Sequence, residues 1–225
     1  DDEGEDDDDD DDDDGPIVLT MDEDKMPGVD SGTTAVVALL SPEGELVVAN
    51  AGDSRAVLCR GGEALDLSLD HKPEDPEELR RIKAAGGVVE EGRVDGNLNL
   101  SRALGDHRYK DAARPPAEHK ICAVPDVKSC TISARDEFAV LACDGVWNVL
   151  TSQQVVDLVR RRLREEREQA PDKPVPEVLR CIACEVCDEC VADSTDNDGT
   201  GADNVSVVIV TWPRAFAARR ADGAG

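Results

Sequence analysis

The sequence predicts an α+β layered fold, and three observations lead to this prediction. Short β-branched segments come in pairs joined by turn residues, which is typical of antiparallel hairpins. Amphipathic segments of helical period lie between and after these strands. Only 2% of the 225 residues are aromatic, whereas 40% are hydrophobic, so the core must consist mainly of Val, Leu, Ile and Ala. Hairpins that alternate with helices indicate an α+β arrangement.

The first 14 residues differ in composition from the rest of the chain. All of them except Gly4 are acidic. A run of like charge without apolar side chains has nothing to offset its conformational entropy. We therefore expect residues 1–14 to be a disordered acidic insert and residues 15–30 to be a linker. The acidic run either keeps the protein in solution or binds basic proteins such as histones.

Paired strands are predicted directly after the linker. Two pairs are each separated by a short turn: residues 33–40 and 45–50 around Ser41–Gly44, and residues 54–59 and 63–67 around Arg60–Gly62. Residues 76–85 are then predicted to form a helix, because Pro76 stands in the first turn, acidic residues precede basic ones and Gly86 follows.

The C-terminal part of the chain is predicted to contain two strands and two helices. Residues 137–143 form a continuous apolar strand, and residues 204–212 form a final buried strand. Thr151 and Gln154 make a capping box at the start of the first helix. Its apolar face consists of Val155, Val156, Leu158, Val159 and Leu163. Prolines in residues 171–176 end this helix, a second runs from about residue 177 to 192, and residues 213–225 are expected to be a flexible tail.

Three aspartates stand where strands meet loops. Asp144 follows the strand 137–143, Asp203 precedes the strand 204–212, and Asp53 lies in a turn between two strands. If the strands beside Asp144 and Asp203 are antiparallel neighbours, both carboxylates reach the same edge of a sheet. Oxygen donors alone suit Mg²⁺ or Mn²⁺ better than zinc or copper. Each aspartate could instead cap a turn, and the spacing alone does not decide between these alternatives.

Seven short motifs follow one another along the chain. They are SGTTA at Ser31–Ala35, ANAGDSR at Ala49–Arg55, DHKP at Asp70–Pro73, AGG at Ala85–Gly87, SRALGD at Ser101–Asp106, ACDGVW at Ala142–Trp147 and GADN at Gly201–Asn204. In these motifs and their order the chain resembles the metal-dependent protein phosphatases, the PPM or type 2C family. The resemblance covers about residues 31–212. The acidic run resembles that of the gamma-type members, in which an acidic insert interrupts the catalytic domain.

The resemblance implies the C-terminal part of a PPM-type domain, an αββα layered sandwich of two antiparallel sheets flanked by helices. It also implies a protein serine/threonine phosphatase with two Mg²⁺ or Mn²⁺ ions, which lower the pKa of the water that attacks the phosphorus. Asp144 and Asp203 match two ligands of that centre. Asp53 matches a residue that can contribute to a third, weaker metal position. Asn148 stands where the family often has a further acid, and its neutral amide is a weaker ligand.

Two parts of the family's active site do not occur in this chain. The family uses an N-terminal arginine to bind the substrate phosphate, and an Asp-Gly-His-Gly-Gly motif that supplies another metal ligand and a histidine acid. The histidines here, His71, His107 and His119, lack that context. We assign no catalytic residue and leave the substrate-binding residues unknown. We expect an N-terminally incomplete domain with little or no activity alone, and exposed strand edges that favour aggregation.

Several other patterns suggest functions that we consider weaker. The series Cys181, Cys184, Cys187 and Cys190 resembles an iron–sulfur or zinc site, but steps of three residues turn a helix by about 300°, so the thiols do not converge. Residues 193–203 resemble a calcium loop. In EF-hand register, however, the first position would be Ser194 and the twelfth would be Val205, where a glutamate is required. His71 and Arg102 are expected to be structural.

Charge and hydropathy exclude other classes of function. A net charge of −26 gives no electrostatic basis for direct binding to nucleic acid. No apolar run reaches the roughly 18 residues that a membrane span needs, and neither an initiator Met nor a signal peptide is present. We expect a soluble intracellular fragment, cytoplasmic or nuclear, with nuclear residence inferred only from the gamma-type resemblance.

Overall fold

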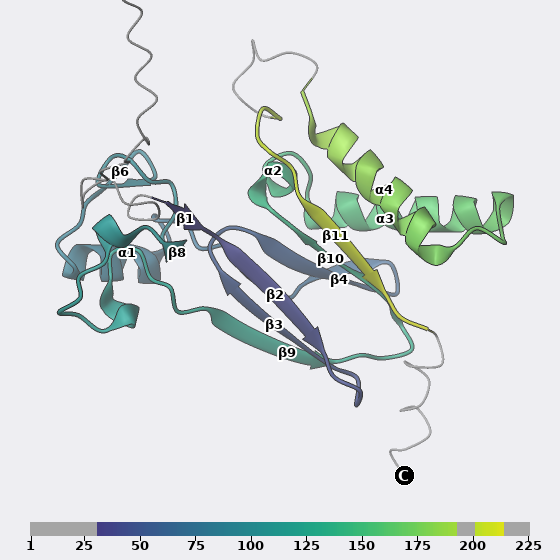
Figure 1. Ribbon diagram of the computed structural model, residues 1–225, viewed down its shortest axis with the longest axis horizontal. Coiled ribbons are helices and arrows are strands. Elements are labelled where there is room, and N and C mark those ends of the chain that lie inside the picture. The colour runs from purple at the N-terminus through teal and green to yellow at the C-terminus, as the bar shows by residue number, and fades with distance from the viewer. Residues whose placement is uncertain (1–30, 193–200, 214–225) are drawn as a thin grey trace, which may run out of the picture.

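The computed structural model describes residues 31–192 and 201–213 (Figure 1). The expected acidic insert at 1–14 and linker at 15–30 lie outside these residues. So do residues 193–200 of the loop before Asp203 and residues 214–225 of the expected tail.

Two antiparallel sheets form the centre of the molecule (Figure 1). One has the strand order β11-β10-β4-β5 and the other has the order β2-β3-β9. Their strands are β2 (Ala35–Leu40), β3 (Glu45–Ala51), β4 (Arg55–Arg60), β5 (Glu63–Asp66), β9 (Asp126–Thr131), β10 (Asp136–Ala142) and β11 (Val207–Thr211). The pairs β2·β3 and β4·β5 are the two hairpins that the sequence predicts. The mixed α+β class is therefore confirmed.

Strand β4 is buried on both of its faces, which places it at the centre of the core. Val57 and Cys59 belong to one apolar cluster, and Ala56 and Leu58 belong to another. The second cluster also contains Leu46 and residues of β10, so it fills the space between the two sheets. This alternation follows from the twofold period of a strand, which sends successive side chains to opposite faces.

Two helices cover the other face of the four-stranded sheet. They are α3 (Ser152–Gln169) and α4 (Val175–Cys190), and their apolar side chains pack against β4 and β10 (Figure 1). The predicted capping box is confirmed, because the Gln154 N–H donates to Thr151 Oγ1 over 3.3 Å and the Thr151 N–H donates to Gln154 Oε1 over 2.9 Å. The predicted start of α4 is wrong, because the helix begins at Val175 and Pro176 lies within its first turn, where proline is tolerated.

A smaller group of elements lies beyond one end of the sheets (Figure 1). It contains α1 (Pro76–Ala84), the short strands β1 (Gly32–Thr33), β6 (Val89–Glu90), β7 (Arg93–Val94) and β8 (Leu104–Gly105), and 3₁₀ turns at His107–Tyr109 and Pro116–Glu118. Helix α1 agrees with the prediction to within one residue, whereas the sequence did not predict the short strands. Ile82, Val94, Ala103 and Ile121 form a separate small core under this region.

The outer face of the three-stranded sheet carries exposed apolar side chains. Val37 and Leu39 of β2 are 59% and 66% exposed, and Val127 of β9 is 64% exposed. Val37 pairs with Ala49 of β3, which pairs in turn with Val127, so the row crosses all three strands. In the part of the chain that the structure describes, no helix combines the length and the apolar character needed to cross a membrane.

Candidate functional site

The two aspartates of the predicted metal site lie at one edge of the four-stranded sheet. Strands β10 and β11 are antiparallel neighbours, and Ala142 pairs with Val207 at the end of β10. Asp144 follows β10 and begins the short helix α2 (Asp144–Trp147), and Asp203 lies in the loop that leads into β11. The two carboxylates were expected to reach the same edge if these two strands were antiparallel neighbours. The structure shows that the strands are antiparallel neighbours.

The two loops that carry these aspartates are in direct contact. The Cys143 thiol donates to the Asn204 carbonyl oxygen over 3.3 Å, and the Ser206 N–H donates to Cys143 Sγ over 3.2 Å. Gly145 is buried, and a Cβ added there would lie 2.4 Å from the Asn204 carbonyl oxygen. Only glycine therefore permits the backbone after Asp144 to pass so close to the backbone after Asp203.

Asp144 lies in a field of negative charge. Burial, Asp53 and Asp203 all raise the pKa of Asp144, and Lys72 opposes them. A carboxylate whose pKa is raised in this way is stabilised in its charged form by a nearby cation. Asn148 lies one turn further along the chain, and its Nδ2 donates to Asp144 Oδ2 over 3.2 Å. In this arrangement the amide of Asn148 orients the Asp144 carboxylate.

Asp53 already has a positively charged partner. Its side chain is 3% exposed in the turn between β3 and β4, and Lys72 Nζ lies 2.5 Å from Asp53 Oδ2. The Lys72 N–H also donates to Asp75 Oδ2 over 2.9 Å, which fixes the backbone of the DHKP segment. Lys72 was not among the residues predicted from the sequence, because nothing in the DHKP motif indicates its partner.

The three aspartates form an open, carboxylate-rich edge instead of a closed metal shell. Among residues 31–192 and 201–213, no three acidic, histidine or cysteine side chains are arranged closely enough to hold a metal ion. The chemistry of the donors nevertheless fits a hard divalent cation, because Asp53, Asp144 and Asp203 offer oxygen atoms and mutual repulsion. These three residues are the candidates among the described residues for contributing to the binding of Mg²⁺ or Mn²⁺.

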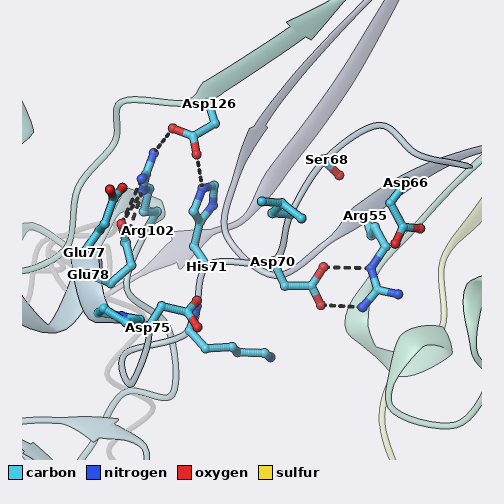
Figure 2. Close-up of a pocket in the computed structure, with 13 residues that line it drawn as sticks. Arg55, Asp66, Ser68, Asp70, His71, Asp75, Glu77, Glu78, Arg102 and Asp126 are labelled. Atoms are coloured by element: carbon cyan, nitrogen blue, oxygen red, sulfur yellow. Dashed lines mark hydrogen bonds and ion pairs between the residues drawn. The ribbon is translucent and has the colours of Figure 1, made fainter.

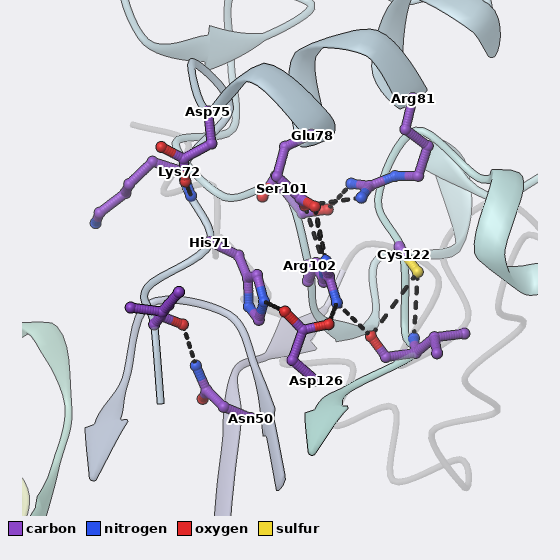
Figure 3. A network of polar contacts seen from close by, with 12 residues as sticks. Asn50, His71, Lys72, Asp75, Glu78, Arg81, Ser101, Arg102, Cys122 and Asp126 are labelled. Atoms are coloured by element: carbon purple, nitrogen blue, oxygen red, sulfur yellow. Dashed lines mark hydrogen bonds and ion pairs between the residues drawn. The ribbon is translucent and has the colours of Figure 1, made fainter. Parts of the chain in front are cut away.

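A partly buried polar network joins His71 to α1 (Figure 3). His71 Nε2 is 3.1 Å from Asp126 Oδ2, and Arg102 Nη1 donates to Asp126 Oδ1 over 2.7 Å. Arg102 also bonds Glu78 in α1, where Nη2 lies 2.8 Å from Oε1. Arg81 binds the other oxygen of Glu78, with Nη1 2.7 Å from Oε2. Arg102 and His71 are therefore held by protein groups, in agreement with the structural roles expected for them.

A cleft of about 500 Å³ lies between this network and β4 (Figure 2). Arg55 forms one wall and binds Asp70 with two bonds of 2.8 Å, and its guanidinium lies 5.1 Å from the centre of the Trp147 ring. Arg102 and His71 line another part of the cleft. Arg55 thus connects Asp70, the neighbour of His71 in the chain, to Trp147 of α2.

The four cysteines of α4 differ in exposure. Cys190 is buried, Cys184 is exposed, and Cys181 and Cys187 are intermediate. Such a spread is what a helix produces when equivalent residues recur every third position.

Comparisons with known proteins identify related sequences. Residues 13–199 match the family model described as protein phosphatase 2C. Protein phosphatase ppm-1.G of Caenorhabditis elegans is 52% identical over 200 residues, which are 88% of this chain and 38% of that protein. Human protein phosphatase 1G is 48% identical over 198 residues, which are 87% of this chain and 35% of that protein. The chain thus spans little more than a third of the length of these relatives.

Solved structures show a similar fold. The structure of a sex determining protein from Caenorhabditis elegans superposes with a TM-score of 0.63 and 30% sequence identity. The superposition covers 84% of this chain and 42% of that one. A similar arrangement of sheets and helices therefore occurs within a longer chain in that structure.

Proposed function

Because the chain belongs to the protein phosphatase 2C family, we propose that it is the C-terminal part of a metal-dependent protein serine/threonine phosphatase. Its substrates would be proteins that carry phosphoserine or phosphothreonine. The observation that most supports this proposal is the direct contact between the Asp144 loop and the Asp203 loop at the end of β10 and β11.

In this proposal the residues of the edge bind and orient two Mg²⁺ or Mn²⁺ ions. Asp144 and Asp203 are the ligands from this chain, and Asp53 contributes to a third position. When bound, such ions supply a water of lowered pKa and positive charge for the phosphoryl oxygens. Asn148 fixes the orientation of the Asp144 carboxylate, and Gly145 lets the two loops approach.

The complete domain is inferred to be an αββα sandwich. Helices α3 and α4 form one outer layer, and the apolar row of Val37, Ala49 and Val127 marks the face on which a second helical layer would pack. Covering such a row removes apolar surface from water, which stabilises a fold. The greater length of the relatives leaves room for this layer outside the present chain.

A titration with Mn²⁺ tests the proposed ligands. Isothermal calorimetry of the chain should show Mn²⁺ binding that is lost in the double variant Asp144→Asn with Asp203→Asn. A matched double variant, Asp157→Asn with Asp172→Asn, removes the same charge from exposed positions in α3 and the following loop, and should bind as the wild type does. Equal binding by the wild type and the Asp144/Asp203 variant would exclude the site.

A phosphatase assay tests the expectation that this chain holds only part of the active site. The sequence contains no Asp-Gly-His-Gly-Gly motif, so the chain holds only part of the ligand set that the family resemblance implies. We therefore expect little or no dephosphorylation of a phosphothreonine peptide by this chain alone with Mn²⁺. Robust metal-dependent turnover by the chain would contradict this expectation.

A second function, binding of basic proteins, is favoured by the acidic run. Thirteen of the first 14 residues are acidic, which gives an attraction for basic partners such as histones that salt should weaken. Deletion of residues 1–14 should abolish histone binding at low salt and leave Mn²⁺ binding intact. Unchanged histone binding would reject this function. Residence in the cytoplasm or nucleus stays a prediction.

A further inference from the structure

The ion pair between Lys72 and Asp53 joins a partly exposed lysine to a buried aspartate. Asp53 is almost fully buried, with 3% of its side chain exposed, whereas the Lys72 side chain is 38% exposed. Asp53 also interacts electrostatically with Asp144, whose charge Lys72 partly balances. A single ammonium group thus lies among carboxylates from two different loops, at the edge where cations are proposed to bind.

The backbone of Lys72 is anchored by a contact separate from that of its side chain. Its backbone N–H is held by Asp75 Oδ2 over 2.9 Å, so the main chain stays in place. Figure 3 shows the side chain extending away from the network of His71, Arg102 and Asp126. A lysine has a flexible four-carbon stem and a strongly hydrated head, and its exposed end therefore has access to water.

We propose that Lys72 is an internal counter-ion that competes with a divalent cation for Asp53, and so limits how tightly the third metal position is filled. This inference rests on the proposed function, because it concerns the same carboxylate edge. A cation can approach Asp53 Oδ2 only after the ammonium has moved away, since both would need the same oxygen at short distance. Lys72 thereby limits the fraction of molecules in which the third metal position at Asp53 is occupied.

The proposal predicts the effect of removing the charge. Without Lys72, the buried Asp53 carboxylate faces Asp144 with no compensating cation, and a buried charge without a partner is strongly unfavourable. Binding of a divalent ion then relieves repulsion and displaces no competitor. We expect Lys72→Met to bind Mn²⁺ up to about fivefold more tightly than the wild type, the factor that corresponds to the upper end for a partly exposed ion pair.

Calorimetric titration with Mn²⁺ alone tests this prediction on the full chain. The matched control is Lys120→Met, because Lys120 pairs with Asp95 over 2.8 Å at a site away from the edge. Lys120→Met should bind Mn²⁺ as the wild type does, and Lys72→Arg, which keeps the charge, should not show the gain. Equal affinity of Lys72→Met and the wild type, or the same gain in Lys120→Met, would overturn the proposal.

A double variant shows whether Lys72 acts through Asp53. The gain from Lys72→Met should disappear when Asp53→Asn is present, because the competed oxygen no longer carries charge. A gain that persists in the double variant would refute competition at Asp53. Absence of Mn²⁺ binding in the wild type and in every variant would instead reject the metal site itself, so failure of the two proposals can be told apart.

An NMR titration of the wild type with Mg²⁺ tests the displacement of Lys72 without relying on the folding of a variant. The NMR signal of the Lys72 Cε group, assigned by comparison with Lys72→Arg, should move towards the position of a solvent-exposed lysine as Mg²⁺ is added. The Lys120 signal should stay in place. Bound Mg²⁺ with an unchanged Lys72 signal would contradict displacement of the ammonium group.

Discussion

Glu78 is a buried acidic residue of α1 that is held by two arginines. The residue is 3% exposed, and its two oxygens receive hydrogen bonds from Arg102 and Arg81. Burial raises the pKa of Glu78, but the bonds from Arg102 and the other donors outweigh it, so the pKa lies below the ordinary value. Glu78 thus links α1 to Arg102, which also binds Asp126.

We predict that Glu78→Gln lowers the free energy of unfolding at neutral pH by on the order of 3 kcal/mol, because it removes one partner of a buried ion pair. Since the pKa of Glu78 is lowered on folding, its contribution is complete above the unfolded value near 4.5 and is lost as the pH falls through the folded value. Urea unfolding at pH 7 and below pH 4.5 measures both effects. The wild type should lose stability in acid more steeply than Glu78→Gln.

The control for this prediction lies one residue away. Glu77 is exposed on the same first turn of α1, so Glu77→Gln should leave the stability nearly unchanged. Equal effects of the two substitutions would show that the change acts through general charge and not through the network.

Individual contacts were the hardest features to predict from sequence. The approach of the Asp144 and Asp203 loops could be predicted only on the condition that two apolar strands are antiparallel neighbours, and the structure meets this condition. The pair of Lys72 and Asp53 could not be predicted, since it joins two loops whose course is set by turns and by the packing of α1. Loops of this kind carry no hydrophobic period.

At the scale of elements, helix α3 shows how a short motif fixes a boundary. Thr151 and Gln154 satisfy one another's backbone N–H groups at its first turn. We predict that Thr151→Ala lowers the free energy of unfolding by about 1 kcal/mol, because one of the helix's first N–H groups loses its acceptor. Chemical denaturation measures this loss. Gln169→Ala, at the exposed last residue of the same helix, should change the stability by less than about 0.5 kcal/mol.

Elements with a periodic apolar pattern were predicted, and elements without one were missed. Helices α3 and α4 have apolar faces that the sequence reveals, and α4 lies about two residues earlier at both ends than predicted. Strand β9 has the sequence DVKSCT and is exposed along most of its length, so it has no such pattern. Its pairing with β3 defines it as a strand, and pairing partners distant in sequence leave no local signal.

At the scale of the whole molecule, the outer face of the three-stranded sheet lies open to solvent. Val37 and Leu39 on β2 and Val127 on β9 are each more than half exposed, on the two strands that flank β3. A contiguous apolar surface of this kind favours association with other molecules. The side chains on the opposite face of β2, such as Val36 and Ala38, pack between the sheets, so the open face is not needed for that core.

We predict that the chain self-associates through this face, and that Leu39→Lys weakens the association. The lysine places a charge on the same apolar face, two residues from Val37, and charged side chains are the usual protection of exposed strands. Sedimentation velocity over a range of protein concentrations should show a smaller weight-average sedimentation coefficient for Leu39→Lys than for the wild type. Because Leu39 is 66% exposed, the free energy of unfolding should change by no more than about 0.5 kcal/mol.

A lone exposed leucine provides the comparison for this last prediction. Leu69 is 73% exposed beside the cleft and lies outside the row on β2, β3 and β9. Leu69→Lys adds the same charge to the chain, so any effect of net charge on association appears in both variants. Association that falls equally in the two variants would be an effect of charge alone. A fall confined to Leu39→Lys would locate the contact on the outer face of the three-stranded sheet, where the second helical layer of the complete domain is inferred to pack.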